Sequence, residues 1–327
     1  MAKWAAMSID PARFVTLGQS GLRVAPIAVG TWAWGERRYW DYEGDFGPND
    51  VADAFTTSVD AGLTLFDTAE VYGDGASEKI LGWLVRKSGA RVAVATKFGL
   101  LPGRKGAADL SRAVDASLRR LGLPRVDLYQ IHWCDTSMAT VESLMHALAD
   151  AVASGKVGAV GVSNFSASET KAAHATLASR GVPLASNQVH YSLLHRAPEV
   201  DGVLDTCREL GVTLLAYSPL EQGLLTGKYT AEHLPSGPRA GHPEFAPESV
   251  ALAQPVVALL REIGRARGDR RPEEAAIAWL RAKGGVLPIA GAKTGAQAAA
   301  NARALDLELD AGEVEALDRA AAAFRRA

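Results

Sequence analysis

The chain has 327 residues, of which 48% are hydrophobic and 22% charged, and its formal net charge is −2. This near-neutral charge gives no electrostatic reason to expect nucleic acid or an anionic membrane as a partner. Its two cysteines, Cys134 and Cys207, make neither a disulfide framework nor a metal-ligand spacing, which favours a reducing compartment. Residues 1–14 lack the apolar run of a signal peptide and no apolar segment reaches membrane-spanning length, so we expect a cytoplasmic protein.

Eight short apolar runs recur along the chain, and amphipathic stretches separate most of them. Near-continuous apolar character is typical of strands that are buried on both faces. The amphipathic stretches, such as 109–122 and 140–155, repeat apolar residues every three to four positions, and many end in glycine, as helices do. Strands that alternate with helices predict right-handed βαβ units and a parallel sheet. The eight runs are residues 26–32, 63–68, 92–98, 126–133, 157–164, 184–191, 212–220 and 286–293.

The strand count favours an α/β fold of the (β/α)₈ TIM-barrel type. The rival, a doubly wound open sheet, should carry G-x-G-x-x-G after its first strand, where this chain has GTWAWGERRYW. We expect one domain over residues 1–327, with 1–12 poorly ordered. Residues 13–30 predict an N-terminal β-hairpin that caps the barrel bottom. A long insertion after strand 7 is expected to be functional, and the sequence leaves open whether its residues 235–249 close over a cofactor.

Polar side chains occur where the predicted strands end. Because the carboxyl ends of barrel strands converge on one mouth, we expect these side chains to form one site. Singly, each has a structural explanation, such as a turn cap for Asp67 or a buried core histidine for His132. Their joint occurrence favours an active site. The strand-end residues are Asp67 with Tyr72, Lys97, His132, Ser163 with Asn164, Gln188, Tyr217 and Lys293.

The first four of these residues have a coherent chemistry. A lysine close to Tyr72 would favour the phenolate and make the tyrosine a better acid. Asp67 would pair Lys97, which would otherwise be a buried lone cation. A Tyr-Lys-Asp-His set therefore suits proton delivery to a developing alkoxide. Carbonyl reduction also needs a hydride, which no side chain supplies, so a nicotinamide cofactor is implied.

The chain resembles the aldo-keto reductases over nearly its whole length. The motifs that carry the resemblance are FDTAEVYG, ATKFG, LYQIHW, GVSNF, NQVHYSLL, YSPLEQGLLTGKY and GAKTGAQAAANARAL. The chain is most similar to the long-loop branch with pyridoxal-reductase-like and potassium-channel β-subunit-like members. The resemblance implies a barrel that reduces a small aldehyde or ketone with NADPH, and it leaves the oligomeric state open. The alternative is a cofactor-binding, redox-sensing regulatory subunit with slow turnover.

The resemblance also assigns roles to residues. It makes Tyr72 the proton donor, with Lys97 and Asp67 supporting it. It makes His132 the group that orients the substrate carbonyl. A lysine beside a glycine and a threonine that open a helix is independently a reasonable phosphate site, which favours NADPH over NADH. The implied NADPH/NADP⁺ site consists of Thr31 and Trp32; Ser163, Asn164 and Gln188 at the carboxamide; Tyr217 under the nicotinamide; Ser218, Leu220, Gly223, Leu225 and Lys228 at the pyrophosphate; Gly291, Lys293, Thr294 and Gln297 at the 2′-phosphate; and Asn301 at the adenine.

Some positions remain ambiguous. Relatives commonly have proline two residues after the histidine, where this chain has Cys134, so the shape of that loop and the role of its thiol stay open. A pocket-lining thiol is favoured over an oxidation switch. For Trp32, packing and a wall of the substrate pocket are equally plausible, whereas packing is favoured for Trp40. Arg239 either lies near phosphate or belongs to a solvated loop.

Overall fold

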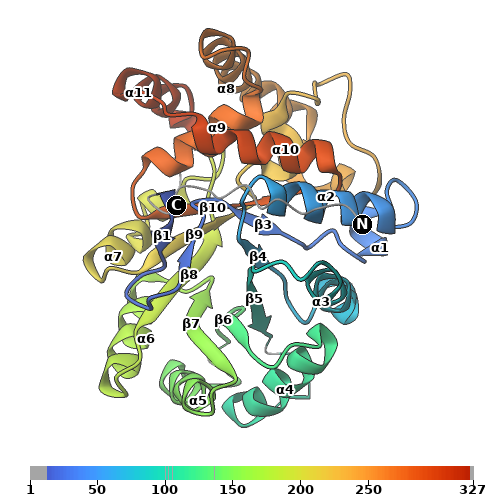
Figure 1. Cartoon of the computed structure of the whole chain (residues 1–327). Helices are drawn as coiled ribbons and strands as arrows, with labels where there is room; N and C mark the ends of the chain where they lie inside the picture. Colours follow the sequence, from blue (N-terminus) through green and yellow to red (C-terminus); the bar gives the residue numbers. More distant parts are fainter. Residues whose placement is uncertain (1–12, 100, 102, 105, 136, 325–327) are drawn as a thin grey trace.

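Eight parallel strands close into a barrel in the computed structural model, which describes residues 13–99, 101, 103–104, 106–135 and 137–324. The predicted TIM barrel is confirmed (Figure 1). The order around the barrel follows the chain, and the last strand pairs with the first. The expectation for residues 1–12 lies outside the described residues. The barrel strands are β3 (Ala28–Gly30), β4 (Leu65–Asp67), β5 (Ala93–Phe98), β6 (Val126–Ile131), β7 (Val157–Ser163), β8 (Leu184–His190), β9 (Thr213–Tyr217) and β10 (Val286–Gly291).

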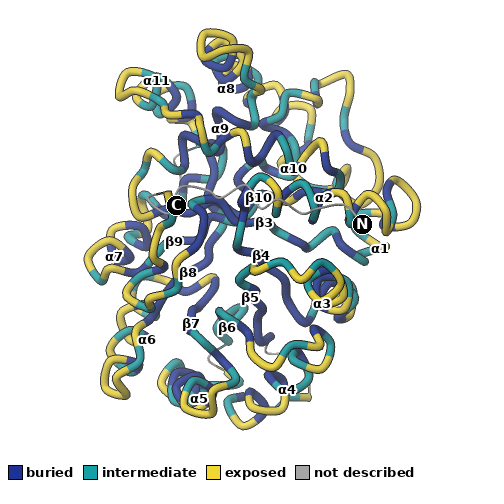
Figure 2. Tube along the Cα trace, in the orientation of Figure 1, coloured by how far each residue is buried: buried dark blue, intermediate teal, exposed yellow. Residues whose placement is uncertain are grey.

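Helices surround the barrel and bury their inner faces against it, while their outer faces are exposed (Figure 2). The α-helices are α1 (Arg37–Trp40), α2 (Pro48–Asp60), α3 (Ala76–Ser88), α4 (Leu110–Leu121), α5 (Val141–Ala153), α6 (Ala167–Ser179), α7 (Val203–Glu209), α8 (Pro247–Ala266), α9 (Pro272–Ala282), α10 (Gly295–Arg303) and α11 (Ala311–Ala320). The 3₁₀ turns are η2 (Tyr72–Gly75), η3 (Gly106–Asp109), η4 (Ala197–Glu199), η5 (Glu221–Thr226), η6 (Gly237–Gly241), η7 (Pro243–Phe245), η8 (Ala304–Asp306) and η9 (Ala322–Phe324). Across the described residues, no helix combines the length and the apolar character needed to cross a membrane.

The predicted hairpin is present and closes the amino-terminal end of the barrel. Its strands are β1 (Val15–Thr16) and β2 (Arg23–Val24), which pair antiparallel. Leu17 and Val24 are fully buried and pack against the layer of small and apolar side chains inside the barrel. The backbone N–H of Gly18 donates to Oγ1 of Thr213, the first residue of β9, at 2.8 Å. The bottom of the barrel is therefore covered, and its other end is left for a site.

Strand alternation explains why polar side chains gather at that other end. Leu65, Ala95 and Leu128 belong to the inner apolar layer. Because side chains two residues apart share a face of a strand, Asp67, Lys97 and Gln130 also point into the barrel, one layer nearer the carboxyl ends. Strand register then sets Lys97 beside Gln130. The insertion after β9 contains η5, η6, η7 and α8, as the long gap in the strand pattern predicted.

Candidate active site

A buried ion pair lies at the centre of the barrel mouth. Lys97 is fully buried, and its ammonium group is paired with Oδ1 of Asp67, which is 3% exposed. Nζ of Lys97 also donates to the carbonyl oxygen of Thr68 at 2.9 Å and lies 3.4 Å from Oη of Tyr72. The pair is thus linked directly to the phenol, as the sequence predicted.

Two glutamines complete the surroundings of the Asp67 carboxylate. Nε2 of Gln188 and Nε2 of Gln130 donate to Oδ2 of Asp67 at 2.9 and 3.2 Å. A Cβ at position 161 would clash with Oγ of Ser186 and approach Cγ of Gln130 to 3.1 Å, so Gly161 leaves space for both side chains. Both carboxylate oxygens therefore accept hydrogen bonds, which buried charge requires.

Burial and the ion pair together set the protonation states of Lys97 and Tyr72. Burial alone would lower the pKa of Lys97, but the charges of Asp67 and Tyr72 outweigh it, and the pKa is raised. Burial raises the pKa of Tyr72, and the nearby ammonium offsets only part of that effect. The expectation that Lys97 would make the tyrosine more acidic holds for the contribution of the lysine but not for the net shift. At neutral pH the lysine is therefore charged and the phenol is protonated.

His132 faces the same phenol. Its ring lies edge-on to the Tyr72 ring, with 5.8 Å between the centroids. Burial, aided by the charge of Lys97, lowers the pKa of His132 to about 3, so the imidazole is neutral at physiological pH. Its Nδ1 is buried and has no hydrogen-bond partner among the described residues. A neutral ring with one donor and one acceptor nitrogen can hold the oxygen of a ligand beside Tyr72.

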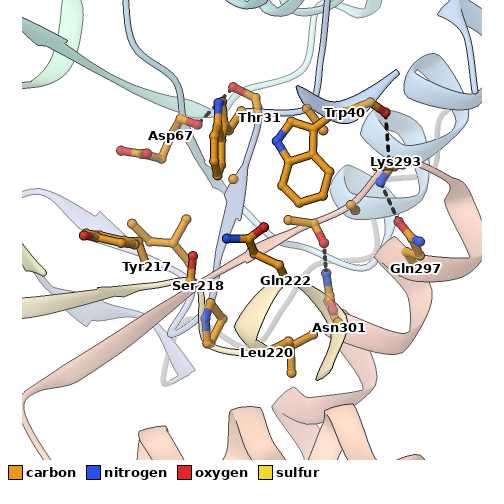
Figure 3. Close-up of a pocket in the computed structure, with 18 of the residues that line it drawn as sticks. Thr31, Trp40, Asp67, Tyr217, Ser218, Leu220, Gln222, Lys293, Gln297 and Asn301 are labelled. Carbon is orange, nitrogen blue, oxygen red and sulfur yellow. Dashed lines mark hydrogen bonds between the residues drawn. The ribbon is translucent and has the colours of Figure 1, made fainter. Parts of the chain in front are cut away.

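One cavity of about 710 Å³ joins this group to the phosphate end predicted from the sequence. It runs from Tyr72 and His132 past Tyr217 to Lys293 and Asn301, and Figure 3 shows part of its wall. The predicted residues that line it are Thr31, Trp32, Asp67, Tyr72, His132, Ser163, Asn164, Gln188, Tyr217, Ser218, Leu220, Gly223, Lys228, Gly291, Lys293, Thr294, Gln297 and Asn301.

Three predicted positions lie outside the cavity lining. Lys97 is buried and contacts Oη of Tyr72 instead of the cavity. The side chain of Leu225 belongs to the core and its N–H donates to the carbonyl oxygen of Leu220, so its assignment to the cofactor site stays a prediction. Cys134 is half-buried and does not line the cavity; burial raises the pKa of its thiol to about 11, so the thiol stays protonated.

The amides at the end of β7 and on β8 are already engaged. Nδ2 of Asn164 donates to the carbonyl oxygen of His132 at 3.0 Å, and its Oδ1 accepts from Oη of Tyr217 at 3.1 Å. Nε2 of Gln188 also donates to Oε1 of Gln130, at 3.3 Å. The carbonyl oxygen of the Gln188 side chain therefore remains as its group for a ligand.

A strained turn follows Tyr217. Ser218, Glu221 and Gln222 have positive φ angles of 52°, 45° and 49°, a conformation that residues other than glycine adopt at a cost. Side chains hold the turn. The buried Glu221 carboxylate bonds to His190 and to Ser192, while Oε1 of Gln222 accepts from Oη of Tyr39 at 2.6 Å. The backbone of this turn is therefore fixed before any ligand binds.

The far end of the cavity is cationic. Lys228, Arg239 and Lys293 line it, so Arg239 lies near the proposed phosphate position. Burial, and then the charge of Arg239, lowers the pKa of Lys293 to about 8. Thr294 caps α10 and accepts from the N–H of Gln297, which places the positive end of this helix dipole at the same spot. An anion is the ligand that this end favours.

Sequence reasoning missed several residues of the site. The strand pattern could have identified Gln130, because it lies two residues before His132 and hence on the same strand face. No sequence pattern identifies Tyr39 and Gln222, because their contact joins segments 183 positions apart. Trp40 was expected only to pack, yet it lines the cavity. Among the described residues, no group of three or more His, Cys, Asp or Glu side chains could hold a metal.

Comparison with known proteins identifies the family. The Aldo/keto reductase family model matches residues 26–322. The chain belongs to this family. It is 40% identical to an uncharacterized oxidoreductase of Mycobacterium tuberculosis, over 93% of this chain and 91% of that protein. It is 37% identical to a chloroplastic pyridoxal reductase of Arabidopsis thaliana, over 92% and 84% of the respective chains.

A solved structure agrees with this assignment. The aldo-keto reductase of Klebsiella pneumoniae in complex with NADPH matches with a TM-score of 0.73 and 27% identity, over 96% of each chain. The protein is therefore an NAD(P)H-dependent oxidoreductase of the aldo/keto reductase family.

Mutation of the buried ion pair tests its contribution to stability. Asp67→Asn should lower the free energy of unfolding by about 3 kcal/mol or more, because it leaves the Lys97 ammonium buried without a counter-charge. Denaturant titration measures this loss. The matched control is Asp115→Asn, which breaks the half-exposed Lys156–Asp115 pair and should cost well under about 1 kcal/mol. Equal, small losses in both variants would contradict the role given to Asp67.

Proposed function

We propose that this protein reduces an aldehyde or ketone to the alcohol with NADPH, and that Tyr72 donates the proton. One observation carries the proposal: a protonated phenol, a buried ammonium and a neutral imidazole meet at one end of a cavity whose other end is cationic. The Klebsiella relative was crystallised with NADPH, which supports the choice of cofactor.

The residues present fit NADPH. The fixed turn at Ser218–Gly223 offers backbone to a pyrophosphate, and the cluster of Lys228, Arg239 and Lys293 suits a 2′-phosphate, which NADH lacks. Oε1 of Gln188 can accept from the carboxamide of a nicotinamide beside Tyr217. Bound there, NADPH supplies the hydride that no side chain can provide.

The proton step follows from the charges in the site. His132 holds the carbonyl oxygen of the substrate beside Tyr72 through a hydrogen bond from its neutral ring. Oη of Tyr72 then donates its proton to that oxygen as negative charge develops on it. The ammonium of Lys97 stabilises the phenolate that remains, and Asp67 keeps the lysine charged.

The substrate end of the cavity is aromatic. The Trp32 ring lies 6.2 Å from the Tyr72 ring and stacks on Tyr39, with centroids 4.9 Å apart. A flat ring surface next to the proton donor suits a planar carbonyl compound. Pyridoxal, an aromatic aldehyde, is the first substrate to test, because a pyridoxal reductase of Arabidopsis is among the similar proteins.

Removing the phenolic hydroxyl tests the proton donor. Tyr72→Phe should lower kcat for carbonyl reduction by about 10³-fold, because positioned acids contribute on the order of 10² to 10⁴. NADPH should still bind with near-normal affinity, since the cationic end of the cavity is untouched. Steady-state assays and a binding titration measure the two. Tyr129→Phe, at a buried tyrosine that does not line the cavity, is the control and should keep its turnover. Full activity in Tyr72→Phe would refute the assignment.

The pH profile provides a second test. Reduction needs Tyr72 protonated, and because burial raises its pKa, kcat at saturating NADPH should stay level up to about pH 9 and fall only above about pH 10. His132, with a pKa of about 3, stays neutral throughout and adds no inflection near neutrality. Measuring kcat from about pH 5 to 11 checks this. A titration between about pH 6 and 8 that is lost in a His132 variant would contradict the account.

A further inference from the structure

The segment from Trp40, the last residue of α1, to Phe46, in the loop before α2, places two aromatic rings around Lys293. Nζ of Lys293 lies 4.8 Å from the centroid of the Trp40 ring and 4.5 Å from that of Phe46. It also donates to the backbone carbonyl oxygen of Trp40 at 3.1 Å. In Figure 3 the Trp40 ring lies beside Lys293 at the edge of the pocket. Two rings and one carbonyl oxygen from this segment therefore fix the position of the ammonium group.

Trp40 also holds a second cation. The guanidinium carbon of Arg239 lies 5.2 Å from the centroid of the same ring. Arg239 comes from η6 in the long insertion, and its Nη1 donates to Oη of Tyr229 at 2.8 Å. The Trp40 ring thus joins the end of α1 to the insertion after β9, and it holds the two positive charges in fixed positions relative to each other.

Contacts within the protein fix the segment that supplies the two rings. The side chain of Glu36 accepts from the backbone N–H groups at the start of α1. Tyr42 and Phe46 are buried and pack edge-on, with ring centroids 5.5 Å apart. Trp40 lies edge-on to Trp32 at 5.2 Å. Trp40 and Phe46 are therefore held in place without relying on Lys293.

We propose that Trp40 and Phe46 are selectivity residues, which act through Lys293 and Arg239 to make the protein prefer NADPH over NADH. The inference rests on the proposed function. Lys293, Arg239, Trp40 and Phe46 all line the cavity. A ring face attracts a cation and restricts its motion, so the two charges are prepared for one anion before it arrives. Burial, Arg239 and Lys228 together disfavour the charged form of Lys293 more than Asp45 and Asp41 favour it, and a 2′-phosphate would offset the repulsion between the cations.

Calorimetric titration with NADPH and with NADH tests this directly, because binding is measured without turnover. Trp40→Leu should weaken NADPH binding about tenfold, within the range of one or two desolvated cation–π contacts, and leave NADH binding within about twofold. Trp40→Phe keeps a ring and should recover most of the affinity. Phe46→Leu, which removes only one contact, should show a smaller loss for NADPH alone.

Trp83→Leu is the matched control. Trp83 lies on α3, is 49% exposed and has Nζ of Lys87 4.3 Å from its ring centroid, so this variant removes a cation–π pair whose residues do not line the cavity. It should leave both affinities unchanged. Equal weakening of NADPH and NADH in Trp40→Leu, or an unchanged NADPH affinity in both Trp40→Leu and Phe46→Leu, would overturn the inference. If Trp40→Leu does not fold, Trp40→Phe and Phe46→Leu decide it. Failure of the wild-type protein to prefer NADPH would instead contradict the proposed function.

Discussion

The pairing of a buried lysine with a buried aspartate is the interaction on which the rest of the site depends. A lone ammonium in a barrel interior would lose its proton or destabilise the fold. Asp67 prevents both outcomes for Lys97, and two glutamine amides satisfy the carboxylate in turn. Burial, aided by the charge of Lys97, keeps His132 neutral, and the same charge moderates the effect of burial on Tyr72. Burial and the ion pair together therefore give each group the protonation state that the proposed carbonyl reduction requires.

Much of this arrangement follows from strand periodicity. A parallel barrel buries both faces of its strands, so eight apolar runs in the sequence were enough to predict it. Because inward positions recur every second residue, a polar residue at the end of each run had to point into one mouth. The positions of Asp67, Lys97 and His132 near Tyr72 were predictable for this reason. The hairpin at the barrel bottom was equally readable, since turn residues separate two short apolar segments.

What the sequence did not reveal depends on contacts between distant loops. Trp40 and Arg239 come close to Lys293 only when the end of α1, the long insertion and the end of β10 meet in the fold. No local sequence pattern predicts that meeting. The net pKa of Tyr72 was also out of reach, because burial and charge act in opposite directions and only the structure gives their balance. Leu225 shows the converse case: the motif suggests a cofactor contact, and the structure places its side chain in the core.

In the proposed reaction, a hydride passes from NADPH to a carbonyl carbon within this cavity. The most direct measurement uses NADPH with deuterium at both hydrogen positions of C4 of the nicotinamide, incubated with the protein and a panel of aldehydes and ketones that includes pyridoxal. Mass spectrometry of the alcohol product then locates the label. We expect one deuterium on the carbinol carbon of at least one product, with one NADPH consumed for each alcohol formed. Bound NADPH with no deuterium transferred to any member of the panel would contradict the account.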